Sequence, residues 1–223
     1  MDLSRGVFLT RIRFKEDCSK YIKKEYYELL IWELMKHSKK FFNDKSITWC
    51  KEQSKGEPDF IDGSGVKYDA KLIIDTIQGS MLGRDKGKDV VGFFREIQRE
   101  LMEFGDKMKR DGELSIQETK FFKIVKKRVL DCKFDENIIL FIPFPIGLDI
   151  EESIIWNRLT DCAQSVYNAI RDENLVGDRD FYYIYPMRDG MRYVIRNPKN
   201  NERDYILLPE YQDSLCFEIV EKD

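Results

Sequence analysis

Residues 137–144 restrict the fold more than any other stretch, because they form a nearly continuous run of apolar side chains. A strand with one face in water alternates apolar and polar residues, whereas a strand that is apolar throughout is typical of a parallel or mixed sheet covered on both faces. Helical patterns lie on both sides of this run, at residues 18–43, 89–104, 114–130 and after Asp149. We therefore predict an α/β or α+β fold with a mixed central sheet flanked by helices.

Two further groups of strand candidates surround this run. The first group precedes it, at residues 46–52, 58–61 and 66–74. The turn sequence Asp62-Gly63-Ser64-Gly65 joins the last two of these in a predicted hairpin. The second group follows the last helix, at residues 181–185, 191–196 and 205–208. We expect a core over residues 1–172 and a strand-rich C-terminal extension, residues 173–223, packed on the same domain.

Composition excludes several classes of protein. Hydrophobic residues make up 42% of the 223 residues, which is enough for a core, and the net charge is only -3. The five cysteines include no Cys-x-x-Cys pair, and no apolar run approaches the ~20 residues of a membrane span. We therefore expect a cytoplasmic protein that is not membrane-bound. The only histidine is His37, which argues against histidine-rich metal sites and Ser-His-Asp triads.

The predicted hairpin carries the residues best suited to chemistry. Side chains of a strand alternate between its faces, so Asp69 and Lys71 point the same way and Tyr68 points the other way. The short turn brings Asp59 back beside either Tyr68 or Asp69. In the second register, two carboxylates and one ammonium group share a small face.

Such a face suits metal-assisted hydrolysis of a phosphodiester. Hard divalent ions such as Mg²⁺ bind oxygen, so Asp59, Asp69 and the backbone carbonyl of Ala70 are candidate ligands, and we expect Mn²⁺ to substitute. A bound metal polarises the phosphate and lowers the pKa of water. Lys71 can orient or deprotonate that water, or stabilise charge in the transition state.

The first long helix adds another candidate carboxylate. At 100° per residue, Glu33 lies on the same stripe as Ile22, Tyr26, Leu29 and His37, in the middle of a mainly apolar face. A carboxylate facing the sheet is costly unless a metal, a metal-bound water or a lysine compensates it. The open alternative is that Glu33 reaches solvent or pairs with Lys36.

At these positions the chain resembles the PD-(D/E)xK nuclease superfamily. Pro58-Asp59 matches its first element, and Asp69-Ala70-Lys71 matches its second. The resemblance covers roughly residues 20–170 and implies a restriction-endonuclease-like core. It also implies a helical glutamate at the active site, for which Glu33 is the first choice, with Glu28 and Glu25 behind it.

The resemblance further implies a substrate and partners. The expected activity is that of a DNA endonuclease in restriction, defence or repair, acting on double-stranded DNA, with a second copy or a partner protein supplying target recognition. Arg84, Lys86 and Lys88 form a candidate basic loop for DNA phosphates.

Two other hypotheses stay open. One is a catalytically inactive nucleic-acid-binding or scaffold subunit that keeps the nuclease fold. The other is an unrelated α+β interaction protein, in which the three polar groups of the hairpin would not converge.

Overall fold

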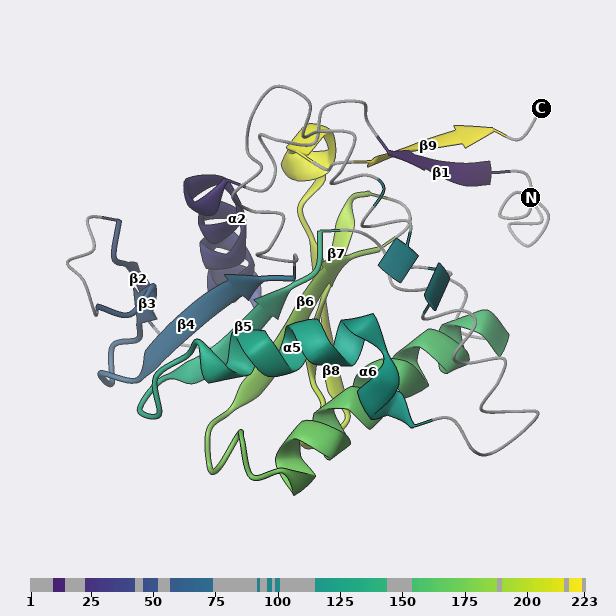
Figure 1. Cartoon of the computed structure of the whole chain (residues 1–223). Coiled ribbons are helices and arrows are strands. Elements are labelled where there is room, and N and C mark those ends of the chain that lie inside the picture. The colour runs from purple at the N-terminus through teal and green to yellow at the C-terminus, as the bar shows by residue number, and fades with distance from the viewer. Residues whose placement is uncertain are drawn as a thin grey trace.

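The computed structural model describes a mixed α/β protein built around one large sheet (Figure 1). The described residues are 10–14, 23–42, 46–51, 57–73, 92, 96–97, 99–100, 115–143, 154–187, 190–214 and 217–221. Within these ranges, no helix combines the length and the apolar character needed to cross a lipid bilayer.

Seven strands form the main sheet, in the order β2-β3-β4-β5-β6-β7-β8. Their bounds are β2 (Thr48–Trp49), β3 (Phe60–Ile61), β4 (Lys67–Leu72), β5 (Asn137–Phe141), β6 (Phe181–Pro186), β7 (Arg192–Asn197) and β8 (Glu202–Leu207). The β4–β5 and β5–β6 pairs are parallel, and the other neighbouring pairs are antiparallel. The predicted mixed sheet is thus confirmed.

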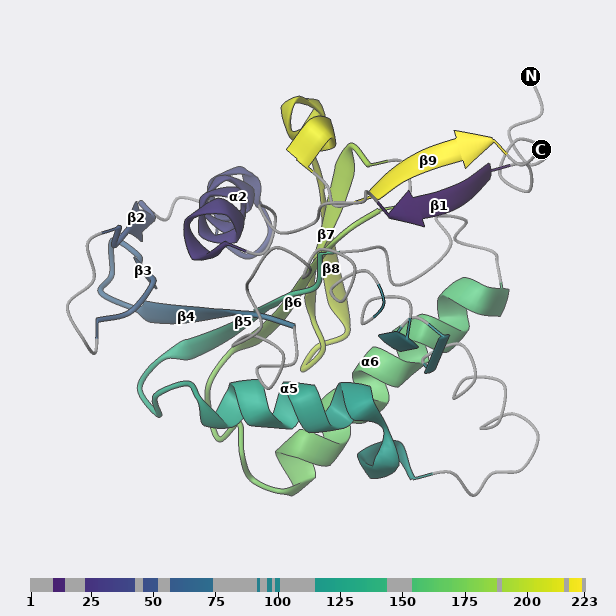
Figure 2. The ribbon, with the colours of Figure 1, turned by 45° about the horizontal axis from the view of Figure 1, so that its top comes forward.

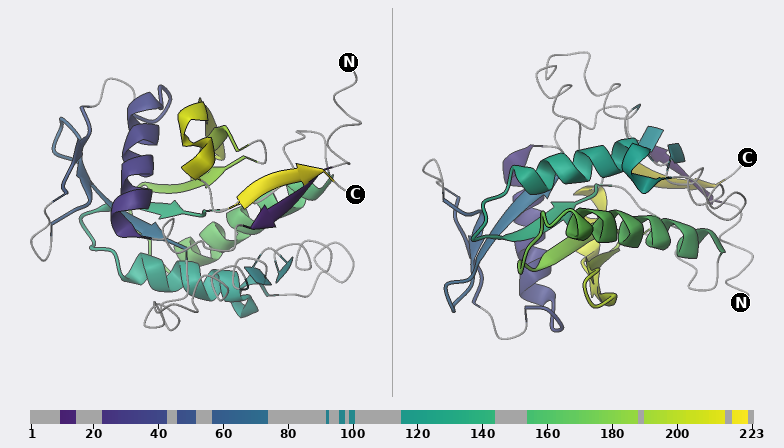
Figure 3. Two further views of the ribbon diagram at one scale, coloured as in Figure 1. Left: turned by 90° about the horizontal axis from the view of Figure 1, so that it is seen from above. Right: turned by 60° about the horizontal axis from the view of Figure 1, so that its bottom comes forward.

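Helices cover both faces of the sheet, as the continuous apolar character of β5 predicts. α2 (Lys24–His37) lies on one face, and α5 (Lys120–Leu130) and α6 (Ile154–Asp172) lie on the other (Figures 2 and 3). Tyr27 of α2 stacks on Phe141 of β5 with ring centroids 6.4 Å apart. On the opposite face, the hydroxyl of Tyr183 donates to the carbonyl of Ala163 in α6. The central strand is therefore buried between two layers.

The helical predictions agree with the structure to different degrees. Of the helix expected over residues 18–43, the described part is helical from Lys24 to His37, and Ser38 is already extended. The expected helix over 114–130 begins with the short turn η3 (Ile116–Glu118) and continues as α5. Most of the helix expected over 89–104 lies outside the described residues.

The C-terminal strands continue the main sheet rather than forming a layer of their own. β6 pairs directly with β5, and β7 and β8 follow it as antiparallel neighbours. The short helix η4 (Pro209–Ser214) comes next along the chain. A separate two-stranded ladder then joins β9 (Phe217–Glu221) to β1 (Thr10–Phe14), near the marked chain ends in Figure 1.

Candidate functional site

The turn between β3 and β4 is held by one aspartate. Oδ1 of Asp62 accepts hydrogen bonds from the backbone N–H groups of Ser64 at 2.9 Å and Val66 at 3.0 Å. Gly65 has a φ of +82°, a conformation that glycine adopts without steric cost. The predicted turn is therefore present, and its side-chain and backbone bonds fix how the two strands meet.

The hairpin adopts the register that gathers the polar groups. Phe60 pairs with Tyr68, so continuing the ladder by one step places Asp59 opposite Asp69. Lys71 lies two residues beyond Asp69 on the same face of β4, and its Nζ is 2.5 Å from Oδ1 of Asp69. Of the two registers that the sequence left open, the structure has the second.

Asp59 also completes the edge of β4. Its Oδ2 accepts the N–H of Ala70 at 2.7 Å, while its own N–H donates to the carbonyl of Tyr68 at 3.1 Å. β3 begins only at Phe60, so the Asp59 carboxylate stands where a strand partner would be. Because the N–H and C=O of a strand residue point to the same edge, the Ala70 carbonyl also faces this side.

Burial dominates the electrostatics of Asp69. Burial raises the pKa of its carboxyl to about 6, and a hydrogen bond with Asp59 acts in the same direction, while the Lys71 charge opposes both. Burial alone would lower the pKa of Lys71, but the charge of Asp69, its hydrogen bond to Lys71 and the charge of Asp59 act together against it, and the pKa is raised. The Lys71 side chain is thus an ammonium ion at neutral pH.

Glu28 of α2 is the third carboxylate of this group. Nζ of Lys24 lies 3.2 Å from its Oε1 and 3.0 Å from Oδ1 of Asp59, so one ammonium group bridges the two acids. The indole N–H of Trp49 donates to Oε2 of Glu28 at 3.0 Å. Burial raises the pKa of Glu28 to about 7, and the charge of Asp59 adds to this. We call Glu28, Asp59, Asp69, Lys24 and Lys71 the acidic cluster.

The orientation predicted for Glu33 is wrong. Its carboxylate binds Nζ of Lys36 at 3.0 and 3.1 Å, which is the alternative pairing. Its charge also raises the pKa of Tyr211 in η4, after burial, so it lies toward η4 rather than the hairpin. Glu28 precedes Glu33 by five residues, about 140° around the helix, so the two cannot face the same site. Through Lys24, Glu28 is joined to Asp59 of the hairpin.

The cluster has the donor chemistry for a hard cation but is held in a lysine-bound arrangement. Carboxylate oxygens are the ligands that Mg²⁺ prefers, and three carboxylates lie within one network of contacts. Among the residues that the structure describes, no three acidic, histidine or cysteine side chains are grouped closely enough to hold a metal ion. Lys24 bridges two of the acids instead. Metal binding would thus require the Lys24 ammonium group to move.

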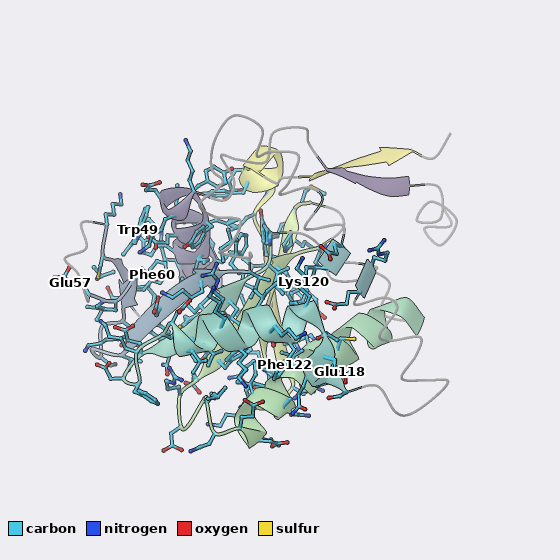
Figure 4. All side chains as sticks on the ribbon, in the orientation of Figure 1. Trp49, Glu57, Phe60, Glu118, Lys120 and Phe122 are labelled. Carbon is cyan, nitrogen blue, oxygen red and sulfur yellow. The ribbon has the colours of Figure 1, made fainter. Side chains whose placement is uncertain are left out.

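A pocket of about 240 Å³ opens beside the cluster. Its lining residues are Lys24, Glu25, Glu28, Trp49 and Lys51. Figure 4 shows Trp49 beside α2, near the edge formed by β2 and β3. The sequence offered one signal for this region, since Lys24 and Glu28 are spaced as an i,i+4 pair on a helix. Trp49 and Lys51 belong to no recognisable sequence motif.

The predicted basic loop of Arg84, Lys86 and Lys88 lies outside the described residues.

Comparison with known proteins adds no relative. No protein-family model matches the chain, and neither the characterised proteins nor the solved structures give a significant match. The case for a function therefore rests on the acidic cluster and its surroundings.

Proposed function

We propose that this protein is a divalent-metal-dependent nuclease of the PD-(D/E)xK type with a restriction-endonuclease-like core, acting as an endonuclease on DNA. One observation carries the proposal: the pattern residues Asp59, Asp69 and Lys71 meet a helical glutamate, Glu28, in one charge-coupled cluster. If the pattern occurred by chance on an exposed hairpin, its charged groups would be separate and solvated. Asp59, Asp69 and Glu28 are instead buried.

Each residue has a defined role in this proposal. Glu28, Asp59, Asp69 and the Ala70 carbonyl would hold Mg²⁺ or Mn²⁺, which would supply Lewis-acid activation of the phosphate and of water. Water attacks phosphorus and loses a proton to solvent, the bond to the leaving oxygen breaks, and that oxygen takes up a proton from solvent. Because Lys71 carries its proton at neutral pH, it stabilises negative charge on the phosphoryl oxygens rather than acting as the base.

The runner-up is an inactive nucleic-acid-binding or scaffold subunit. The observation in its favour is that the acids have internal partners: Lys24 for Glu28 and Asp59, the Ala70 N–H for Asp59, and Lys71 for Asp69. A cluster retained only for stability would look the same. In either case, target recognition by a second copy or a partner protein remains part of the proposal.

Nicking of supercoiled plasmid separates the two functions. We expect cleavage with Mg²⁺ or Mn²⁺, none after thorough chelation, and binding without cleavage in Ca²⁺. Cleavage that survives chelation would contradict the metal-dependent mechanism. Absence of cleavage with every divalent ion, by protein that still binds DNA, would favour the inactive subunit.

A further inference from the structure

We propose that the pocket between α2 and β2 is a subsite for one unpaired nucleobase of the substrate strand, stacked on Trp49, with Lys51 contacting the adjoining phosphate. This inference rests on the proposed nuclease function and names a part of the substrate that binds beside the acidic cluster. It assigns a binding role to Trp49 and Lys51, neither of which belongs to the acidic cluster.

A chain of contacts links the pocket to the acidic cluster. Trp49 donates to Glu28 at 3.0 Å, Glu28 pairs with Lys24, and Lys24 reaches Asp59 at 3.0 Å. Lys24 and Glu28 belong to both the pocket lining and the cluster. A ligand in the pocket would therefore lie beside a phosphate bound through a metal at the carboxylates.

The size and lining of the pocket fit a single ring system. Its volume of about 240 Å³ is below the roughly 300–1,000 Å³ of pockets that enclose a whole drug-sized ligand. Trp49 supplies a flat aromatic wall, half-buried and fixed through its indole N–H to Glu28. A fixed, partly exposed indole is a suitable platform for stacking a base without regard to its sequence.

The charges around Trp49 orient the strand. Nζ of Lys51 lies 4.7 Å from the centroid of the Trp49 ring, so this face admits a cation from solvent. Lys51 is exposed, and moving its ammonium group from the ring to a phosphate would leave the ring face to the base. Glu25, also exposed, lines the pocket and would repel a phosphate there. The phosphate is therefore expected on the Lys51 side.

Binding is measured without catalysis, by fluorescence anisotropy of a labelled short single-stranded DNA in the presence of a chelator. Trp49→Leu removes the ring and should weaken binding about 5- to 150-fold, the range expected for losing one base–aromatic stack. Trp49→Phe keeps a ring and should retain most of the affinity. The wild type should bind an oligonucleotide with abasic sites in place of its nucleotides more weakly than intact DNA. For Trp49→Leu, the difference in affinity between the two oligonucleotides should be small.

The lysines provide a matched control. Lys36 also lies over an indole, with Nζ 4.1 Å from the Trp32 ring, but it does not line the pocket. Lys51→Ala should weaken binding several-fold and reduce its dependence on salt, whereas Lys36→Ala should not. Because both lysines are exposed, these variants decide the question even if Trp49→Leu fails to fold. Equal effects of the two lysine variants would overturn the proposal.

The outcomes distinguish the subsite from the nuclease function. Plasmid cleavage by the wild type, together with unchanged oligonucleotide binding by a folded Trp49→Leu, would eliminate the subsite and leave the nuclease in place. If the wild type cleaves plasmid with none of the divalent ions tested, but Trp49→Leu still binds the oligonucleotide more weakly, the subsite is supported and the nuclease function is rejected. If Trp49→Leu prefers intact to abasic DNA as strongly as the wild type does, the bases are contacted elsewhere. That result would also overturn the subsite.

Discussion

Lys71 and Lys67 lie on the same strand and the same face, but their surroundings differ. Lys71 pairs with the buried Asp69, whereas Lys67 pairs with Asp135 at the surface. If Lys71 stabilises charge in the transition state, Lys71→Ala should lower kcat about 10²–10⁴-fold with little change in DNA affinity. Steady-state cleavage and separate binding measurements test this.

Lys67→Ala is the control for that substitution, because it removes an equal charge from β4 without touching the cluster. It should leave kcat within about two-fold, since an exposed ion pair contributes little to stability. Near-normal cleavage by Lys71→Ala would remove Lys71 from the mechanism. Equal losses in the two variants would show that the charge of the strand, rather than the position of Lys71, matters.

Two glutamates of α2 provide a second matched pair. Glu28→Gln removes a cluster carboxylate but keeps an oxygen that can accept from Trp49, so we expect cleavage to fall at least about 10-fold. The metal-free variant should be as stable as the wild type or more so, because it loses repulsion from Asp59. Glu33→Gln should cleave normally. Kinetics and thermal unfolding report on both, and the reverse ranking would restore Glu33 to the site.

The misassignment of Glu33 has a cause in the residues of α2. Leu29, Leu30 and Ile31 are consecutive, so an apolar stripe can be drawn either through Tyr26 and Leu29 or through Tyr27, Leu30 and Ile31. The helix buries the second set. The 100° spacing therefore could not choose between the two stripes, and we selected the one that carries Glu33 instead of the one that the helix buries.

At the scale of elements, the hairpin turn determines whether the cluster forms. Asp62 binds the backbone of Ser64 and Val66 through Oδ1, and Oδ2 accepts from the Tyr68 hydroxyl. Asp62→Ala should cost about 1–3 kcal/mol of stability, because two part-buried N–H groups and the buried Tyr68 hydroxyl lose their Asp62 acceptor. It should also reduce cleavage although no ligand is changed. Asp62→Asn, which keeps the Oδ1 acceptor, should lose less of both.

Denaturant midpoints and cleavage rates check the role of the turn. A normal cleavage rate in folded Asp62→Ala would show that the register is set elsewhere, for instance by the packing of Tyr68 against Phe42.

The hairpin also shows what local sequence can determine. Turn residues and period-two alternation predicted both strands and the shared face of Asp69 and Lys71. They could not choose between the two registers, because the Asp62 side-chain bonds and the packing beneath β4 select one. Likewise, the bridge of Lys24 to Asp59 joins residues far apart in sequence and follows only from how α2 docks.

For the whole molecule, buried acids make stability depend on pH. The pKa of Glu28 is raised from 4.5 to about 7 in the folded chain, mainly by burial. The folded protein therefore keeps a proton that the unfolded chain loses, and its stability falls as pH rises from 4.5 to about 7. Without metal, Tm should fall over this window by roughly 2–4 °C for each kcal/mol lost.

Calorimetry at several pH values, with Glu28→Gln beside the wild type, isolates this contribution. The variant should lose less stability across the window. Mg²⁺ should restore the wild type at neutral pH, because metal ligands bind as carboxylates. Identical pH profiles for the two proteins would mean that Glu28 does not hold its proton in the folded state.

The fold could be predicted where the apolar pattern of a single segment shows which of its faces are buried. The apolar run of β5 indicated a sheet covered on both faces, and the structure confirms it. Strand order was harder to predict, since β6 pairs with β5 although the whole of α6 separates them in the sequence. The pairing of β1 with β9 could not be predicted, because neither segment has a local signal for a partner about two hundred residues away.

That last pairing bears on how the chain matures during synthesis. Thr10–Phe14 leaves the ribosome about two hundred residues before its partner Phe217–Glu221. Closing so long a loop carries a large entropic cost unless the intervening chain is already compact. The seven-stranded sheet can thus assemble on the nascent polypeptide before β1 has its partner. Until β9 has been synthesised, the backbone donors and acceptors of β1 can pair with other strand edges.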